Sequence, residues 1–243
     1  MYIIKLNAID STNTYLKEMS SVSLPQDYTV VVAELQTKGR GQMGAEWIAE
    51  SGKNLTASVF KRFTAFNVTD QFYISMTVSL AIIRALNSFK IPRLHIKWPN
   101  DILSADRKLC GILIENVIKN NRLQGSIIGF GLNVNQKSFD NLPQASSMSL
   151  LTGVIYNKEE VLSELLKQLK IYFTLLEQKK LLEIKSEYES LLFRKNKPST
   201  FRTPKDDSFS GIIQGVTETG QLQVWTEDDI IKIFDLKEVK LMY

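Results

Sequence analysis

Residues 36–47, QTKGRGQMGAEW, combine closely spaced glycines with a permanent positive charge. Gly39 and Gly41 free the backbone for close approach to a ligand, and Arg40 between them carries a planar guanidinium that matches carboxylate and phosphate groups. This composition predicts a loop that binds an anion. The alternative is a mobile surface loop, in which the glycines make turns and the cations keep the chain soluble.

Gly44 completes the spelling G-x-G-x-x-G, which is typical of dinucleotide-binding turns. In such a turn the third glycine begins a helix, and an acidic residue about 20 positions further on binds the ribose. Here Gly52 follows too soon for a helix, and no acidic residue closes a strand near position 64. No Gly-Lys-Ser/Thr sequence follows either, so the pattern predicts neither a Rossmann turn nor a Walker loop.

A second group of reactive residues lies within IKWPNDILSADRKLCGILIE, residues 96–115. Asn100 and Asp101 follow a predicted strand, where polar side chains reach over the edge of a sheet, and Lys108 introduces the next apolar strand at the same rim. Gly111 weakens that strand unless something must approach its backbone. The alternative for the Pro-Asn-Asp sequence is an ordinary turn, because all three residues favour turns.

A third element, GFGLNVN at residues 129–135, places Gly129 and Gly131 in a strand that ends in two asparagines. Together with Gly111, these glycines lie in two neighbouring predicted strands. They predict a flat slot in which a ligand lies against bare backbone.

The composition argues against several classes of chemistry. The chain has 243 residues, a net charge of +4, one histidine and one cysteine. His95, in the apolar context RLHIKW, is expected to be structural, since a histidine triad or a multi-histidine metal site needs more than one. Cys110, expected to be a small core residue, cannot form an intramolecular disulfide, which together with the lack of a signal peptide predicts a cytoplasmic protein. No apolar run approaches the roughly 18 residues of a membrane span, and the scattered lysines predict no nucleic-acid face.

β-branched and apolar runs predict the strands that must position these residues. The predicted strands are 27–36, 54–60, RLHIKW ending at Pro99, and a hairpin of KLCGILIENVI with GSIIGFGLNVN around KNNRLQ. A helix is expected from a cap at Thr69 and Asp70 to about residue 88. Its apolar face consists of Phe72, Met76, Leu80 and Ile83.

The chain is predicted to become helical from Asn157, which with Glu160 resembles a capping box. The residues at helical spacing that follow are Leu162, Leu165, Leu169, Tyr172 and Leu176. Near residue 195 the polar segment RKNKPSTFRTPKDDS predicts a boundary, and short alternating strands follow it, split by turns at Thr219-Gly220 and Asp228-Asp229. We therefore predict an α+β domain over 1–195, a mixed sheet with helices mainly on one face, and a small all-β domain over 196–243.

Five ordered blocks carry a family resemblance: DSTN (10–13), ELQTKGRGQMGAEW (34–47), KWPND (97–101), KLCGILIE (108–115) and GFGLNVN (129–135). The chain resembles biotin–protein ligases over nearly its whole length. The resemblance implies a class II synthetase-like catalytic domain and an SH3-like C-terminal domain. It also implies a reaction: ATP activates biotin as biotinyl-5′-AMP with Mg²⁺ assisting, and a lysine on the carrier domain of a biotin-dependent carboxylase then takes the biotin. Biotin and ATP would be substrates, with no tightly bound prosthetic group.

The resemblance also assigns site residues. Arg40 and Lys108 are the expected catalytic cations, in keeping with a reaction that develops negative charge on oxygens. The residues expected to bind biotin are Ser11, Thr12, Asn13, Gln36, Gly39, Arg40, Gly41, Gln42, Lys108, Gly111, Leu113 and Gly129. Those expected to bind ATP are Arg40, Trp47, Trp98, Asn100, Asp101, Lys108 and Asn133, with Asp101 also the expected Mg²⁺ ligand. Without the resemblance, Trp47 and Trp98 are better explained by packing.

Two departures from the family pattern bear on function. Many members read G-R-G-R-x-G-R in the loop, whereas Gln42 and Ala45 stand at two of these arginine positions and predict a weaker hold on ATP or the adenylate. DSTN begins at residue 10, which leaves no room for the DNA-binding helix-turn-helix of some members. The expected form is therefore monofunctional and does not bind DNA or membranes. The sequence leaves open which carboxylase is the acceptor, and whether the chain is a monomer or a homodimer.

Two alternative functions stay open at the level of sequence. A lipoate–protein ligase shares the fold class and the acyl-adenylate chemistry, although such relatives lack the KWPND and G-R-G pairing. A non-catalytic biotin-binding paralogue is the other, which the presence of Arg40, Lys108 and Asp101 opposes.

Overall fold

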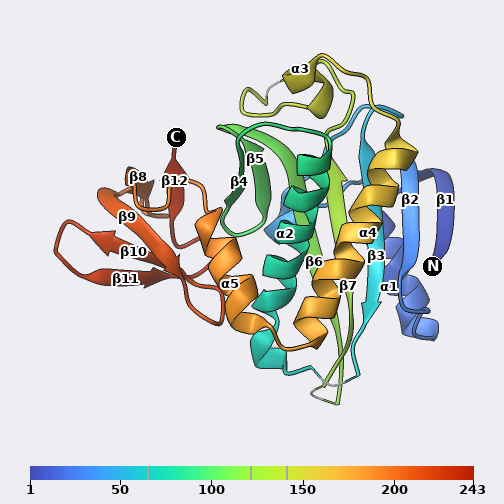
Figure 1. Cartoon of the computed structure of the whole chain (residues 1–243), viewed down its shortest axis with the longest axis horizontal. Helices are drawn as coiled ribbons and strands as arrows, with labels where there is room; N and C mark the ends of the chain where they lie inside the picture. Colours follow the sequence, from blue (N-terminus) through green and yellow to red (C-terminus); the bar gives the residue numbers. More distant parts are fainter. Residues whose placement is uncertain (65, 121, 141) are drawn as a thin grey trace.

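A mixed sheet forms the centre of the chain (Figure 1). The structure is a computed structural model that describes residues 1–64, 66–120, 122–140 and 142–243. Within these residues the sheet has seven strands in the order β1-β2-β3-β7-β6-β5-β4, of which only β1 and β2 pair in parallel. Their bounds are β1 Tyr2–Ile9, β2 Thr29–Gln36, β3 Leu55–Arg62, β4 Leu94–Lys97, β5 Asp101–Ser104, β6 Arg107–Lys119 and β7 Arg122–Leu132. The predicted β6–β7 hairpin is confirmed, with residue 121 of its turn outside the described residues.

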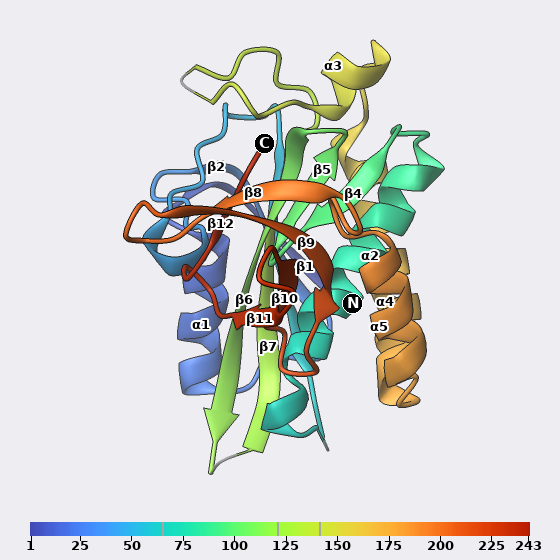
Figure 2. The same cartoon turned by 90° about the vertical axis from the view of Figure 1, so that its left-hand side faces the viewer.

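Helices lie mainly on one face of this sheet, as predicted (Figure 2). That face carries α2 (Phe72–Ser88), α4 (Lys158–Glu177) and α5 (Leu181–Ser190), which are packed against one another and against the sheet. The opposite face carries α1 (Thr12–Val22), which packs on β2, β3 and β7 through Leu16. Burial of apolar side chains in these layers is the main source of stability.

The sequence analysis did not predict α1, because serine, threonine and asparagine make up five of its eleven residues and its apolar face is narrow. The start of α2 was predicted wrongly: Thr69 and Asp70 form a separate 3₁₀ turn, Val68–Asp70, and the helix begins at Phe72 without a side-chain cap. The start of α4 was predicted correctly. Its cap differs in detail, since the Asn157 side chain accepts a hydrogen bond from the Glu159 amide at 2.9 Å and not from that of Glu160.

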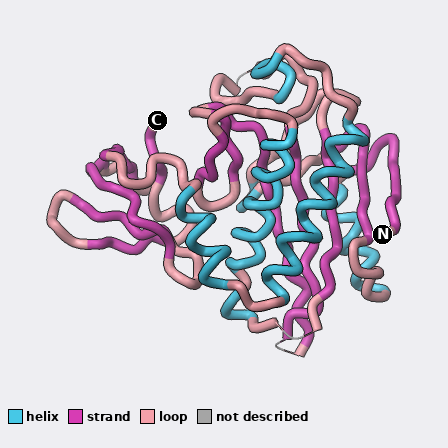
Figure 3. The backbone as a smooth tube through the Cα atoms, viewed as in Figure 1, coloured by secondary structure: helices cyan, strands magenta, loops and turns pink. Residues whose placement is uncertain are grey.

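A second, smaller sheet follows at the C-terminal end and lies beside α5 (Figure 3). Its five strands have the order β11-β10-β9-β8-β12 and are all antiparallel. They are β8 Pro198–Arg202, β9 Ser208–Val216, β10 Leu222–Thr226, β11 Ile231–Phe234 and β12 Lys240–Met242. The small all-β module is thus confirmed, whereas the division at residue 195 stays a prediction. No helix of the described residues is both long and apolar enough to cross a membrane.

Hydrogen bonds from the end of β4 and from α5 attach the small sheet to the rest of the chain. The Trp98 indole Nε1 donates a hydrogen bond to the Gly220 carbonyl at 2.8 Å, and the Glu189 carboxylate accepts one from the Val216 amide at 3.1 Å. Gly220 lies so close to the Phe72 ring, at the start of α2, that an added Cβ would fall 2.1 Å from Phe72 Cγ. The two sheets share one hydrophobic core, so this attachment makes both of them walls of the same site.

Candidate active site

A cavity of about 560 Å³ lies between the main sheet, the loop that follows β2, and the small sheet. Its volume lies within the range of small-molecule sites. The predicted site residues that line it are Ser11, Thr12, Asn13, Gln36, Arg40, Gly41, Gln42, Trp47, Trp98, Asn100, Asp101, Lys108, Gly111, Leu113 and Gly129. The topology brings them together because β3 pairs with β7, which is far from it in the chain, and β6 and β5 follow β7 in the sheet.

Gly39 and Asn133 are the predicted residues that do not line the cavity. The Gly39 carbonyl accepts a hydrogen bond from the Trp47 amide at 3.0 Å, and an added Cβ would fall 2.2 Å from the Trp47 carbonyl oxygen. Gly39 therefore lets the two ends of the loop meet. The Asn133 side chain is buried, and its Nδ2 donates to the Ser146 carbonyl at 3.0 Å. Its amide thus holds the chain after β7 in place.

A buried polar pocket forms one end of the cavity. Thr12 donates from its backbone N and its Oγ1 to Gln36 Oε1, at 2.8 and 3.0 Å. Ser58 Oγ lies 2.7 Å from Thr12 Oγ1 and donates to Asn13 Oδ1 at 2.6 Å. Sequence reasoning missed Ser58; the signal was a serine within the largely apolar strand LTASVF. These side chains hold one another in fixed positions, with hydrogen-bonding capacity left to offer a ligand.

The loop after β2 closes on itself. The Gly41 amide donates to the Ala45 carbonyl at 2.6 Å, and a short 3₁₀ turn, Gln42–Gly44, forms its tip. Gly44 has φ +85°, a left-handed conformation that glycine adopts without strain. This compact turn holds Arg40 against the main sheet.

Arg40 meets a carboxylate there. Its Nη2 lies 3.3 Å from Glu115 Oε1 and its Nη1 lies 3.5 Å from Oε2. Glu115 also accepts from Asn13 Nδ2 at 3.0 Å and pairs with Lys17 at 3.4 Å. Burial acts to raise the pKa of Glu115, but the hydrogen bond from Asn13 and the charges of Arg40 and Lys17 outweigh it, so that the pKa is below its ordinary value. Glu115 thus links the polar pocket to the loop.

The predicted slot of bare backbone is covered by side chains of the chain itself. The Trp47 ring lies on Gly131 and Gly111, where an added Cβ would fall 2.2 and 3.2 Å from ring atoms. Asn13 covers Gly129 in the same way, with its Oδ1 2.2 Å from an added Cβ. The three glycines also line the cavity, and a ligand lying against their backbone stays a prediction. The Trp47 Nε1 is buried and has no hydrogen-bond partner among the described residues.

The other end of the cavity is charged. Lys108 Nζ pairs with Asp101 Oδ1 at 2.7 Å and lies 5.8 Å from the centre of the Trp47 ring. Lys97, which the sequence analysis did not single out, also lines the cavity. Burial, followed by the charge of Lys108, lowers the pKa of Lys97, although Asp101 acts in the opposite direction. Two lysines thus lie at this end of the cavity, and the Asp101 carboxylate pairs with Lys108, an arrangement suited to binding an anion.

Two residues discussed for their chemistry lie outside the cavity lining. Cys110 is fully buried in β6, and burial raises its pKa, as expected for a core thiol. His95 is half-buried in β4 near the Phe193 ring, and burial together with Lys197 lowers its pKa. Neither shares in the site.

Comparison with known proteins finds a matching family model. Residues 6–133 match the model described as the biotin/lipoate A/B protein ligase family. The bifunctional ligase/repressor BirA of Bacillus spizizenii is 30% identical over 96% of this chain and 72% of its own. The biotin–[acetyl-CoA-carboxylase] ligase of Mycobacterium tuberculosis is 31% identical over 65% of this chain and 59% of its own.

The fold matches a solved structure over its whole length. Biotin protein ligase from Aquifex aeolicus, in complex with biotin and ATP, has a TM-score of 0.80 and 26% identity. The match covers 99% of this chain and 98% of that one, so it includes both sheets.

Proposed function

Because the chain belongs to the biotin/lipoate A/B protein ligase family, we propose that it is an ATP-dependent biotin–protein ligase. It would activate biotin as biotinyl-5′-AMP and transfer it to a lysine on the biotin carboxyl carrier domain of a carboxylase. The observation that carries this proposal is that one cavity holds both the buried polar pocket and the cations Arg40 and Lys108.

The polar pocket suits the ureido ring of biotin. That ring has one carbonyl acceptor and two N–H donors in a fixed plane. Thr12, Asn13 and Gln36 offer hydroxyl and amide groups whose positions are fixed by hydrogen bonds among them and with the buried Ser58. Leu113 and the glycines of β6 and β7 would contact the apolar part of the ligand. With the ureido ring in the polar pocket, the biotin carboxylate would point toward the charged end of the cavity.

The first step needs positive charge more than it needs a proton transfer. A biotin carboxylate oxygen attacks the α-phosphorus of ATP, the bond to the oxygen bridging the α- and β-phosphates breaks, and pyrophosphate leaves with the electron pair. Negative charge grows on the phosphate oxygens, which fixed cations stabilise. Arg40 and Lys108 are the proposed cations, and each would exchange its present carboxylate partner, Glu115 or Asp101, for the substrate.

Asp101 is the proposed contact for the Mg²⁺ that would accompany ATP. Magnesium in such sites is held by one or two carboxylates together with the substrate phosphates. The described residues contain no group of three or more metal-ligating side chains, which fits an ion that arrives with the nucleotide better than a resident one. Trp47, Trp98 and Asn100 are the proposed nucleotide contacts.

In the second step the carrier lysine attacks the carbonyl carbon of the mixed anhydride. The bond from that carbon to the phosphate oxygen breaks, AMP leaves with the electron pair, and the amine loses one proton. Closure of the loop around Arg40 would keep water from the anhydride until the carrier arrives.

The deciding experiment is transfer of biotin to an isolated biotin carboxyl carrier domain in the presence of ATP and Mg²⁺, followed by intact mass spectrometry. We expect one biotinyl group per carrier, with none when ATP is omitted. Lipoate in place of biotin is the matched control. ATP-dependent transfer of lipoate but not biotin, or no transfer of either, would contradict the proposal.

A further inference from the structure

A second hollow lies outside the reaction cavity, where β4, the end of α5 and the segment 191–197 meet. This segment links α5 to β8, and we call the space the linker hollow. It has a volume of about 340 Å³. Leu192 lines both the linker hollow and the reaction cavity, so the two spaces are neighbours. The polar residues that line the linker hollow are His95, Ser190, Arg194, Lys195, Asn196 and Lys197.

Backbone hydrogen bonds hold the linking segment against both sheets. The Phe193 amide donates to the Ile96 carbonyl of β4 at 2.8 Å, and the Asn196 amide donates to the Ile213 carbonyl of β9 at 3.0 Å. Arg194 and Asn196 are left-handed, with φ of +61° and +58°. The chain is therefore not extended here, and four consecutive residues line one hollow, whereas the side chains of a strand alternate between two faces.

The linker hollow carries positive charge without a balancing acid. Arg194, Lys195 and Lys197 line it, and no carboxylate of the described residues does. Lys195 pairs with Glu189 at 3.4 Å, and the Arg194 Nε donates to the Ser199 hydroxyl at 2.8 Å. Lys197 is exposed and has no ion-pair partner in the part of the chain that the structure describes. An anion in the hollow would compensate this charge.

His95 brings a titratable group to the same hollow. It is the single histidine of the chain, and its ring centre lies 6.0 Å from that of Phe193. Burial, and then the charge of Lys197, lowers the pKa of His95, while a hydrogen bond to the Leu191 backbone acts in the opposite direction. The imidazole is therefore mostly neutral near pH 7. A bound anion would offset the charge of Lys197 and favour protonation.

We propose that the linker hollow is an accessory binding site for a small anion that carries a phosphate group. Three cations around one hollow suit a group with two negative charges better than a carboxylate with one. Arginine offers a planar fork and lysine a mobile charge, and Ser190 and Asn196 add neutral donors. The volume is at the lower end for small-molecule sites, so it suits free phosphate or a small phosphate ester. This site takes no part in the proposed reaction.

The test follows the His95 ring resonance by NMR while inorganic phosphate is added to the whole, untagged protein. Because the chain has one histidine, the resonance reports on the linker hollow. Phosphate should shift it saturably and raise the pKa of His95. Lys197→Gln should raise the Kd for phosphate about tenfold, the lower end for an exposed charge-assisted hydrogen bond. Glycerol 3-phosphate is the second probe: tighter binding identifies an ester as the ligand, and equal or weaker binding identifies free phosphate.

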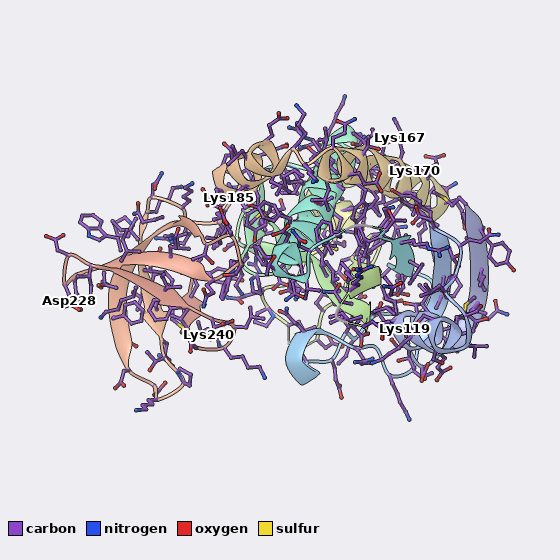
Figure 4. All side chains as sticks on the ribbon, turned by 90° about the horizontal axis from the view of Figure 1, so that it is seen from below. Lys119, Lys167, Lys170, Lys185, Asp228 and Lys240 are labelled. Atoms are coloured by element: carbon purple, nitrogen blue, oxygen red, sulfur yellow. The ribbon has the colours of Figure 1, made fainter. Side chains whose placement is uncertain are left out.

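Two variants separate the linker hollow from other cationic places. Lys108→Gln removes a cation of the reaction cavity and should leave the phosphate response of His95 unchanged. Lys119→Gln removes an exposed charge that lines neither space and should have no effect; Figure 4 shows Lys119 on the side of the molecule away from the small sheet. No saturable shift in wild type, or the same response in Lys197→Gln, would overturn the inference.

Stability distinguishes binding from a structural role. Without phosphate, Lys197→Gln should keep the Tm of wild type, because Lys197 has no ion pair to lose among the described residues. Phosphate should raise the Tm of wild type more than that of the variant, since a ligand of the folded state stabilises it by mass action. A lowered Tm in Lys197→Gln with an intact His95 response would show a structural role alone. None of these measurements uses biotin or ATP, so they stand or fall apart from the proposed function.

Discussion

Arg40 and Glu115 are 75 residues apart in the sequence and are joined by an ion pair of 3.3 Å at the wall of the cavity. The same carboxylate accepts a hydrogen bond from Asn13 in the polar pocket. One side chain therefore fixes both a predicted catalytic cation and a predicted biotin contact. Since Glu115 does not line the cavity, its effect on the reaction would be indirect.

Glu115→Gln should reduce adenylate formation about tenfold, because a charged hydrogen-bond acceptor that positions Arg40 and Asn13 becomes neutral. The KM for biotin should rise as well. Stopped-flow or exchange kinetics would measure both. Glu115→Asp, which keeps the charge, should recover part of the loss. Equal rates for wild type and Glu115→Gln would show that the ion pair does not position Arg40.

The same residue predicts a pH dependence of stability. Its pKa is lowered in the folded chain, so its contribution is present above the ordinary glutamate value of about 4.3 and is lost as the pH falls through the lowered value. Wild type should therefore lose stability relative to Glu115→Gln between these two values. Denaturant unfolding from pH 7 to pH 3 would measure the difference, which should stay constant if the pair contributes nothing.

Lys108→Gln should lower the rate of adenylate formation about 100- to 1,000-fold, the usual loss when a group that stabilises transition-state charge is removed. Calorimetric binding of biotin should change much less, because the polar pocket is intact. Lys119→Gln is the control: Lys119 lies at the other end of the same strand and does not line the cavity (Figure 4). A Lys108→Gln enzyme with wild-type rates would contradict the assigned role.

Gln42→Arg should slow the release of biotinyl-5′-AMP, because it adds a cation to an otherwise uncharged loop tip. Filter retention of labelled adenylate would measure the release rate. Gln178→Arg, at the end of α4, adds the same charge away from the cavity and should have no effect. Equal retention by wild type and Gln42→Arg would sink the idea that the loop is weakened.

Gly131→Ala should displace the Trp47 ring, since the new methyl group would fall 2.2 Å from it. Overpacking of this kind typically costs about 1–3 kcal/mol. The double variant with Trp47→Ala should recover most of the loss, because the clash is then absent. Thermal unfolding of wild type, the two single variants and the double variant would measure the coupling energy between residues 47 and 131. Additive losses would show that the two residues do not meet.

The sequence predicted most of the fold because the main strands and the longest helices have strong periodic patterns. It missed α1, whose burial rests on Leu16 together with the polar Thr12 and Asn13. Such a helix is stabilised by tertiary contacts and not by its own propensity.

For the site, the motifs predicted which loops converge, and the sheet order brings them together. The motifs did not predict which side chains are in contact. Ser58 joins the polar pocket only because Thr12, in α1, packs over it. Trp47 lies on glycines of β6 and β7, which are far from it in the sequence. Contacts of this kind follow from folding and cannot be read from local sequence.

The contact of Trp98 with Gly220 has a consequence for recombination between relatives. A chimaera that took its small sheet from another ligase would carry a foreign turn onto the Trp98 indole and the Phe72 ring. Because the two sheets share one core, a mismatch there would weaken the cooperative unfolding of the whole chain and not of the grafted part alone. Trp98, Phe72 and Glu189 would therefore have to be exchanged together with the small sheet, although all three precede the predicted domain boundary at residue 195.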